Sequence, residues 1–125
     1  MLGDNDAMAT IAVSDLASAT RFYGDTLGLQ PGEGGGPTVA VYRSGGSTIV
    51  VYESEFAGTN QATSATWGVG DEVDAIVETL GAAGVAFEHY DLPGLSLDGD
   101  VHVADGFRAA WFRDPDGNIL HINNL

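Results

Sequence analysis

The apolar residues near the start of the chain change from a spacing of two to a spacing of three and four. In residues 9–13, Ala9, Ile11 and Val13 alternate with Thr10 and Ala12, which is typical of a strand with one buried face. The apolar residues of 16–27 then follow helical spacing, and Asp15 stands where it can cap that helix. Gly28 follows, and a glycine at this position can end the helix by adopting a left-handed backbone conformation. The pattern predicts a strand followed by a capped helix.

The same pattern returns in the second half of the chain. The segment TIAVSDLASATRFYGDTLGL from Thr10 aligns without gaps with TWGVGDEVDAIVETLGAAGV from Thr66, with five identical positions. In the second copy Asp71 takes the place of the helix cap, and Gly84 takes the place of the stop. The shared order of strand, cap, helix and stop predicts an internal repeat.

Further strands are predicted after each helix. In the first half Gly45 and Gly46 separate two alternating segments, which is typical of a hairpin. In the second half a DPDG turn separates two more segments, because proline and glycine both favour a turn there. Each half therefore has the predicted order β-α-β-β-β. The predicted strands are 38–44 and 47–54, with a short one near Leu29, and then 85–90, 107–113 and 118–124.

The segment 90–106 is predicted to be a long connection, of the kind that often covers a binding site. His89 and His102 would then belong to this loop region, and no spacing favours a metal cluster of these two residues with His121. Asp114 and Asp116 of the DPDG sequence are interpreted as turn residues, because a calcium loop needs many more ligands in line.

Length and composition fit one domain, residues 1–125, with a substantial core. The chain has 125 residues, of which 44% are hydrophobic. The repeat divides it into a first copy at 7–55, a linker at 56–63 and a second copy at 64–125.

Charge and cysteine content exclude several functions. The chain has a formal charge of -14, four arginines and no lysine, so binding to nucleic acid or to an anionic membrane is not expected. There is no cysteine for a disulfide, a thiolate nucleophile or a cysteine-ligated metal. Arg108 and Arg113 are interpreted as partners of surface acids. With no signal peptide or membrane segment recognised, we expect a cytoplasmic protein.

Two segments resemble the vicinal oxygen chelate superfamily, which includes glyoxalase I, bleomycin and fosfomycin resistance proteins and extradiol dioxygenases. They are IAVSDLASATRFYGDTLGL near the start and AAWFRDPDGNILHI near the end. Together with the repeat, the resemblance covers essentially the whole chain. It implies an α+β fold in which two βαβββ modules form curled, mixed β-sheets around a cavity, and it implies a homodimer.

The resemblance also locates the positions of metal ligands in metal-dependent members. A first-strand ligand, commonly histidine, stands seven residues before the capping aspartate, and here that residue is Met8. The repeat places its counterpart at Ser64, or at Ala65 after a slip of one residue. Neither a thioether, a hydroxyl nor a methyl group replaces imidazole for a divalent metal. We therefore predict no cofactor.

The last strand offers one ligand, His121, where the family commonly has glutamate. Its counterpart in the first module is expected near Tyr52 or Glu53, with the register left open. If a divalent metal binds after all, His121 and Glu53 are the ligands that the sequence suggests.

Strand alternation identifies the residues expected to line the cavity. Leu120 and Ile122 should face the helices, which leaves His121 facing the cavity, where we expect it to matter more for binding than for folding. Trp67 is expected on the helix side, in the core. The predicted ligand-binding residues are Met8, Thr10, Ser64, Thr66, Ile119, His121 and Asn123.

These observations favour a metal-free protein that binds a small, partly apolar organic ligand, as bleomycin resistance proteins do by sequestration. The alternative is an enzyme, a lyase, isomerase or epimerase, that uses His121 as an acid or base or recruits a divalent metal. A third possibility is a module that binds a protein partner and no longer uses its cavity.

Overall fold

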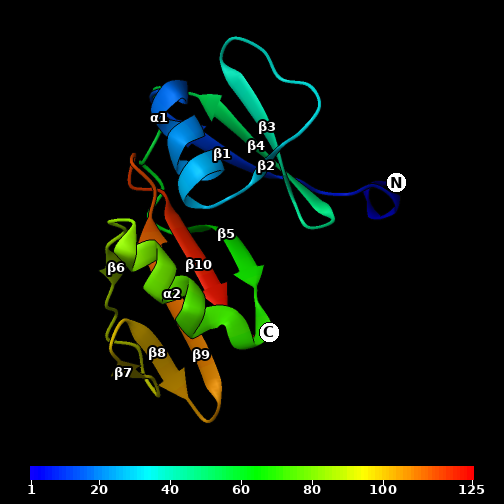
Figure 1. The fold of residues 1–125 in the computed structure, drawn as a ribbon. Coiled ribbons are helices and arrows are strands. Elements are labelled where there is room, and N and C mark those ends of the chain that lie inside the picture. Colours follow the sequence, from blue (N-terminus) through cyan, green and yellow to red (C-terminus); the bar gives the residue numbers. More distant parts are fainter. The chain divides into compact units, whose positions relative to one another are not determined.

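The structure, a computed structural model, describes residues 1–125 and divides the chain into two compact units. The N-terminal unit is Met1–Thr59 and the C-terminal unit is Asn60–Leu125. Each unit holds one β-sheet and one main helix, so the fold is α+β with two mixed sheets, as predicted (Figure 1). None of the helices combines the length and the apolar character needed to cross a membrane.

The N-terminal unit is a four-stranded sheet in the order β1-β4-β3-β2. Strand β1 runs parallel to β4, and the other neighbours are antiparallel. The β3–β4 hairpin turns at Gly45 and Gly46, as the sequence predicts. The strands are β1 (Ala9–Val13), β2 (Gln30–Pro31), β3 (Val39–Ser44) and β4 (Ser47–Glu53), and a short 3-10 turn, η1 (Leu2–Asp4), precedes them.

Helix α1 (Leu16–Thr20) begins at the predicted cap. The Asp15 carboxylate accepts hydrogen bonds from the backbone N–H groups of Ala17 and Ser18, at 3.2 and 3.4 Å. The helix continues in a π-helical segment, η2 (Arg21–Thr26), and Gly28 follows with a φ of +76°. The cap and the glycine stop of the first copy are confirmed.

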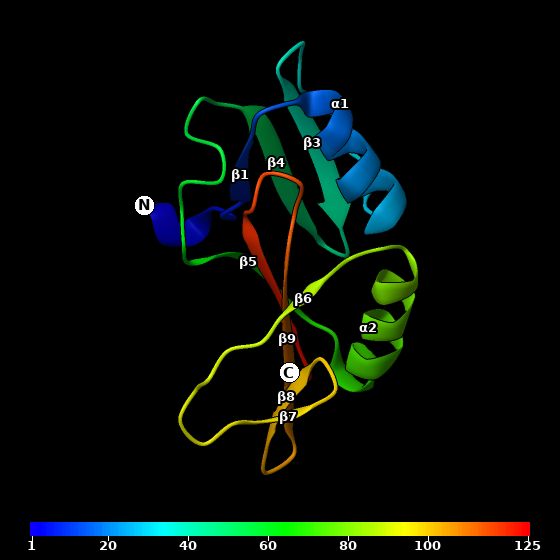
Figure 2. The ribbon, with the colours of Figure 1, turned by 90° about the vertical axis from the view of Figure 1, so that its left-hand side faces the viewer.

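The two faces of the N-terminal sheet differ in character. Figure 2 shows α1 on one side of the sheet. The residues buried on that side come from both layers: Ile11, Val13, Tyr23, Tyr42, Ile49 and Val51. The opposite face, called here the open face, carries residues of intermediate or high exposure: Thr10, Val41, Arg43, Thr48 and Val50.

The C-terminal unit repeats this order and adds a hairpin. Its sheet has the order β5-β10-β9-β8-β7, with β5 parallel to β10 and with β6 also paired to β9. The elements are β5 (Thr63–Gly68), α2 (Val73–Ala82), β6 (Phe87–Glu88), β7 (Ser96–Asp98), β8 (Val101–Ala104), β9 (Phe107–Arg113) and β10 (Ile119–Asn123).

The added hairpin corrects the prediction for residues 90–106. Strand β6 has only two residues, and the segment expected to be a loop contains β7 and β8. Strand β7 pairs with β8, and β9 is long enough to pair along one edge with both β6, at Phe112, and β8, at Ala109. His102 is therefore a strand residue.

The start of α2 also differs from the prediction. Asp71 does not cap the helix, because it lies inside a 3-10 turn, η3 (Gly70–Glu72). Gly70, the first residue of this turn, has a φ of +56°, and the helix itself begins at Val73. Asp15, by contrast, has an extended backbone next to α1, and Glu72, which precedes α2, makes no side-chain cap bond. Gly84, with a φ of +92°, does follow the helix as predicted.

The DPDG segment forms the predicted turn between β9 and β10. The Asp114 carboxylate is buried and accepts hydrogen bonds from the backbone N–H groups of Asp116 and Asn118 and from the Asn118 side-chain amide, at 2.8–3.0 Å. Gly117 has a φ of +90°. Asp114 thus organises the turn, which places His121 in register on β10.

Candidate functional site

An aromatic cluster occupies the face of the C-terminal sheet opposite α2. His121 on β10 is paired in register with Trp111 on β9, and their rings stack with centroids 4.3 Å apart. His102 on β8 meets Trp111 edge to face at 4.9 Å, and Tyr90 meets the same indole at 5.5 Å. We call these four residues the Trp111 cluster. In Figure 2 the yellow connection that follows β6 lies on the side of the sheet away from α2.

His121 is held in one tautomer by its neighbours. Its Nδ1 lies 3.1 Å from the Ala110 carbonyl oxygen, which can only accept, so Nδ1 carries the proton. Its Nε2 lies 3.2 Å from the Asn123 side-chain nitrogen and accepts from that amide. Burial lowers the pKa of His121, the hydrogen bond to Ala110 opposes that shift, and nearby His102 lowers it further. With 8% of its surface exposed, His121 is a neutral, buried imidazole.

His102 is buried completely, with 0% exposure. Its Nε2 accepts a hydrogen bond from the backbone N–H of Tyr90 at 2.9 Å, so the proton of the neutral ring belongs on Nδ1. That Nδ1 is buried without a hydrogen-bond partner in the protein. His89 lies outside this cluster, because its Nε2 pairs with the Asp100 carboxylate at 2.7 Å.

The other predicted site residues of the C-terminal unit have different positions. Ile119 and Asn123 lie on the same strand as His121, and all five residues of β10 are buried, on both of its faces. Thr66 on β5 pairs in register with His121 but is exposed. Ser64 is the extra residue of an irregularity in β5, where the pairing shifts between Ile119 and Leu120. Trp67 pairs with Ile122 on the helix side, as expected, but it is half-buried and does not belong to the buried core.

The N-terminal unit carries a cleft of about 830 Å³ on the open face of its sheet, which we call the open-face cleft. Met8, which precedes β1, lines it and is 55% exposed. Thr10 lies on the same face, beside Val50 in the strand register. Of the residues predicted from the sequence, Met8 lines this cleft and Thr10 does not, and the lining residues from β3 and β4 were not predicted. The cleft is lined by Met8, Pro31, Gly32, Glu33, Val41, Arg43, Thr48 and Val50.

The strand registers identify the first-module counterpart of His121. Thr10 and Thr66 are equivalent in the repeat; Thr10 pairs with Val50 and Thr66 pairs with His121. The counterpart is therefore Val50, two residues before Tyr52. Glu53 turns to the helix side, where its carboxylate accepts a hydrogen bond from the backbone N–H of Leu16 at 3.3 Å.

The residues at the positions where the resemblance implies metal ligands do not fit a divalent metal. Met8 offers a thioether and Ser64 a hydroxyl, which are poor ligands for such ions. Both ring nitrogens of His121 are engaged by Ala110 and Asn123, and Glu53 is engaged at the start of α1. No group of three histidines or carboxylates in the structure could hold a metal ion.

Solved structures of similar fold cover nearly the whole chain. A lactoylglutathione lyase from Agrobacterium tumefaciens is 18% identical, with 95% of this chain and 92% of that chain covered and a TM-score of 0.70. The fosfomycin resistance protein FosX from Mesorhizobium loti is 15% identical, with coverage of 100% and 94% and a TM-score of 0.71. FosX from Listeria monocytogenes, solved with Mn(II) and sulfate, is 18% identical, with coverage of 98% and 90% and a TM-score of 0.70. At these identities the likeness establishes the fold alone.

The sequence comparison agrees with the fold. None of the curated proteins shows significant similarity to the chain. The family model of the Glyoxalase/Bleomycin resistance protein/Dioxygenase superfamily matches residues 7–122. The resemblance stated from the two sequence segments is thereby confirmed, and the chain belongs to this superfamily.

Proposed function

We propose that the chain binds a small, partly apolar organic molecule on the open face of its N-terminal sheet, without using a metal. The observation that carries this proposal is the open-face cleft. Its volume of about 830 Å³ lies in the range typical of small-molecule sites, which is about 300–1,000 Å³. Its lining joins apolar side chains with a few polar groups, as such sites usually do.

The strand pairing explains why the cleft has an apolar floor. Val41 and Val50 face each other across β3 and β4 and are both half-buried on the open face. Met8 adds a flexible thioether side chain at the edge of this floor, and methionine adapts to ligands of different shape. An apolar ligand body can therefore displace water from these three side chains.

Binding without catalysis is favoured by the state of His121. An acid or base must reach its substrate with a free ring nitrogen, and both nitrogens of His121 are engaged within the sheet. The enzymatic alternative requires the bond to Asn123 to open before His121 can act. Turnover of a substrate that stops in His121→Gln protein would establish that alternative in place of sequestration.

The proposal can be tested with naphthalene-1-carboxamide as a neutral, partly apolar probe. In protein labelled at methyl groups, we expect saturable NMR shifts at Met8, Val41 and Val50, with the same result in the presence of a chelator. Val50→Gln should weaken binding, because it places an amide in the apolar floor. Val39→Gln is the matched control, since Val39 lies half-buried on the same face and outside the cleft. Shifts confined to other methyl groups would contradict the proposal.

We also propose that the protein acts as a homodimer, as members of this superfamily commonly do. Sedimentation velocity should then give a species of twice the 12.9 kDa mass of one chain. A single species at the mass of one chain would contradict it. A cytoplasmic location stays a prediction from the sequence.

A further inference from the structure

Arg43 differs from the other three arginines of the chain because its side chain has no partner in the protein. It lies on β3, exposed, and lines the open-face cleft. No hydrogen bond or ion pair joins its guanidinium to any other group, in a protein where 18 acidic residues outnumber four arginines. An unpaired cation in such a protein, at the edge of a cleft, calls for an explanation.

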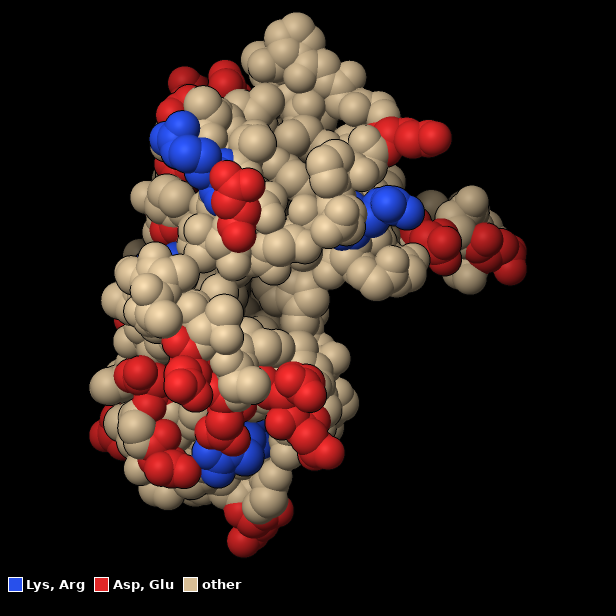
Figure 3. Space-filling view, viewed as in Figure 1, with Lys and Arg blue, Asp and Glu red and all other residues tan.

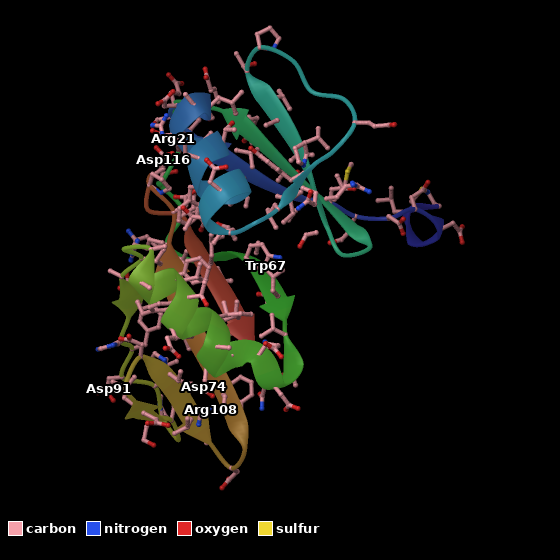
Figure 4. All side chains as sticks on the ribbon, viewed as in Figure 1. Arg21, Trp67, Asp74, Asp91, Arg108 and Asp116 are labelled. Atoms are coloured by element: carbon pink, nitrogen blue, oxygen red, sulfur yellow. The ribbon has the colours of Figure 1, made fainter.

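The other arginines all have local partners. Arg108 binds the carboxylates of Asp74 and Asp98, at 2.6 and 3.1 Å, and Figure 4 shows Arg108 and Asp74 close together. Arg113 pairs with the Glu88 carboxylate. Arg21 donates to the Ser18 hydroxyl at 3.2 Å, on the helical layer of the N-terminal unit. Arg108 and Arg113 join separate elements of the C-terminal unit, and Arg21 bonds within its own helical segment, whereas Arg43 makes no such contact.

The surroundings of Arg43 form a polar end next to an apolar floor. Thr48 stands directly opposite Arg43 in the β3–β4 register and also lines the cleft. Two residues further along the same strands, Val41 pairs with Val50. Because side chains two apart share a face, the guanidinium and the hydroxyl lie at one end of the floor that Val41 and Val50 form.

We propose that the open-face cleft recognises a small organic carboxylate, with its carboxylate bound by Arg43 and Thr48 and its apolar body on Val41, Val50 and Met8. This inference rests on the function proposed above and adds the chemical class of the ligand. A guanidinium offers two parallel N–H donors that match the two oxygens of a carboxylate. The Thr48 hydroxyl can donate a third hydrogen bond to the same group.

The charge of the rest of the protein makes this arginine selective. Figure 3 shows acidic side chains spread over the visible face, with few basic ones among them. With a formal charge of -14, the protein repels anions in general, so an anion binds only where a specific cation compensates. Glu33 also lines the cleft, and its carboxylate opposes the anion.

The test compares two probes that have nearly the same shape, naphthalene-1-carboxylate and the neutral naphthalene-1-carboxamide. By titration calorimetry the unmodified protein should bind the carboxylate at least about tenfold more tightly than the amide, as a charge-assisted hydrogen-bonded pair would give. In Arg43→Gln this preference for the carboxylate over the amide should disappear. Arg43→Lys should keep part of the preference, because it keeps the charge but not the two-donor geometry.

Arg21→Gln is the matched control, because it removes the same charge from the same unit but on its helical layer. It should keep the full preference for the carboxylate. If Arg21→Gln and Arg43→Gln lose the preference for the carboxylate to the same extent, the inference is overturned, because net charge alone would then explain the preference. Equal binding of the two probes by the unmodified protein would overturn it too, while leaving the proposed function intact. If neither probe binds, the proposed function itself fails.

Discussion

The two units use the same face of the same kind of sheet in opposite ways. In the N-terminal unit the central pair of this face is Val41 and Val50, and a cleft lies above it. In the C-terminal unit the equivalent pair is Trp111 and His121, and their stacked rings are joined by His102 and Tyr90. The first face carries an open cleft, and the second is filled by side chains of the protein.

The comparison shows that residues at equivalent positions in the two units can have different surroundings. The registers make Val50 and His121 equivalent, yet one lines a cleft and the other is buried with both ring nitrogens bonded. The two faces differ at this strand pair, which is Val41 and Val50 in one unit and Trp111 and His121 in the other, and the C-terminal unit also has the additional β7–β8 hairpin. Fold membership therefore does not assign a role to either residue.

The largest expected effect on stability comes from a cavity in the core of the C-terminal unit. Leu120, with 0% exposure, faces α2, and Leu120→Ala should lower the free energy of unfolding by about 2–5 kcal/mol. The midpoint of urea unfolding of that unit, followed by tryptophan fluorescence, measures this cost. A cost below that of a surface substitution would mean that β10 does not pack as described.

His121→Ala should cost less than Leu120→Ala but more than a surface change, about 1–3 kcal/mol. The substitution removes a ring stacked on Trp111 and leaves the buried Ala110 carbonyl and the Asn123 amide without that partner. From the sequence alone we expected His121 to matter mainly for binding. Urea midpoints for His121→Ala and Leu120→Ala distinguish a structural role of His121 from a role in binding. If His121→Ala leaves stability unchanged, the expectation from the sequence, a role mainly in binding, holds instead.

A tryptophan at Val41, the position equivalent to Trp111, tests whether an indole can fill the face of the N-terminal sheet as it does in the C-terminal unit. Val41→Trp should fill the open-face cleft and abolish binding of naphthalene-1-carboxamide, because the indole takes the place of the ligand body. Its effect on stability should be small, within about 1 kcal/mol, since Val41 lies on an open face. Titration calorimetry measures the loss of binding, and the midpoint of urea unfolding measures the change in stability. Unchanged binding would show that the ligand site lies elsewhere.

The smallest expected effect concerns pH. Because burial lowers the pKa of His121 below its ordinary 6.5, the unfolded chain takes up a proton there before the folded chain does. The stabilising contribution is therefore present above pH 6.5 and is lost as the pH falls through and below that value. His121→Gln should flatten this part of the stability profile relative to the unmodified protein. An unchanged slope would mean that the imidazole is solvated.

Local signals in the sequence were sufficient for much of the fold. The Asp15 cap, the Gly28 stop, the Gly45–Gly46 hairpin and the DPDG turn each depend on neighbouring residues, and each was predicted correctly. Asp71 shows the limit of this reasoning. One glycine with a positive φ, at Gly70, moves the start of the second helix, although the repeat itself is regular.

The candidate sites depended on pairing that the sequence does not display. Alternation correctly placed His121 away from α2. It did not indicate the cluster around it, in which Trp111 stacks on His121, and His102 and Tyr90 contact Trp111 from β8 and from the segment after β6. Alternation along 107–113 could have indicated Trp111. Arg43 could have been noticed as a cation opposite Thr48 across the Gly45–Gly46 hairpin, since a two-residue turn fixes that register.

The parallel pairing of first and last strands has a consequence for the order of folding. In each unit the neighbours β3–β4 or β9–β10 can pair as soon as both are made, because short turns join them. Strands β1 and β5 must instead wait for β4 and β10, whose paired residues lie about 40 and about 55 residues further along the chain. During synthesis each first strand therefore emerges early and stays unpaired until its unit is complete. The slow step of folding in both units should be the same one, the closing of the sheet by the strand that was made first.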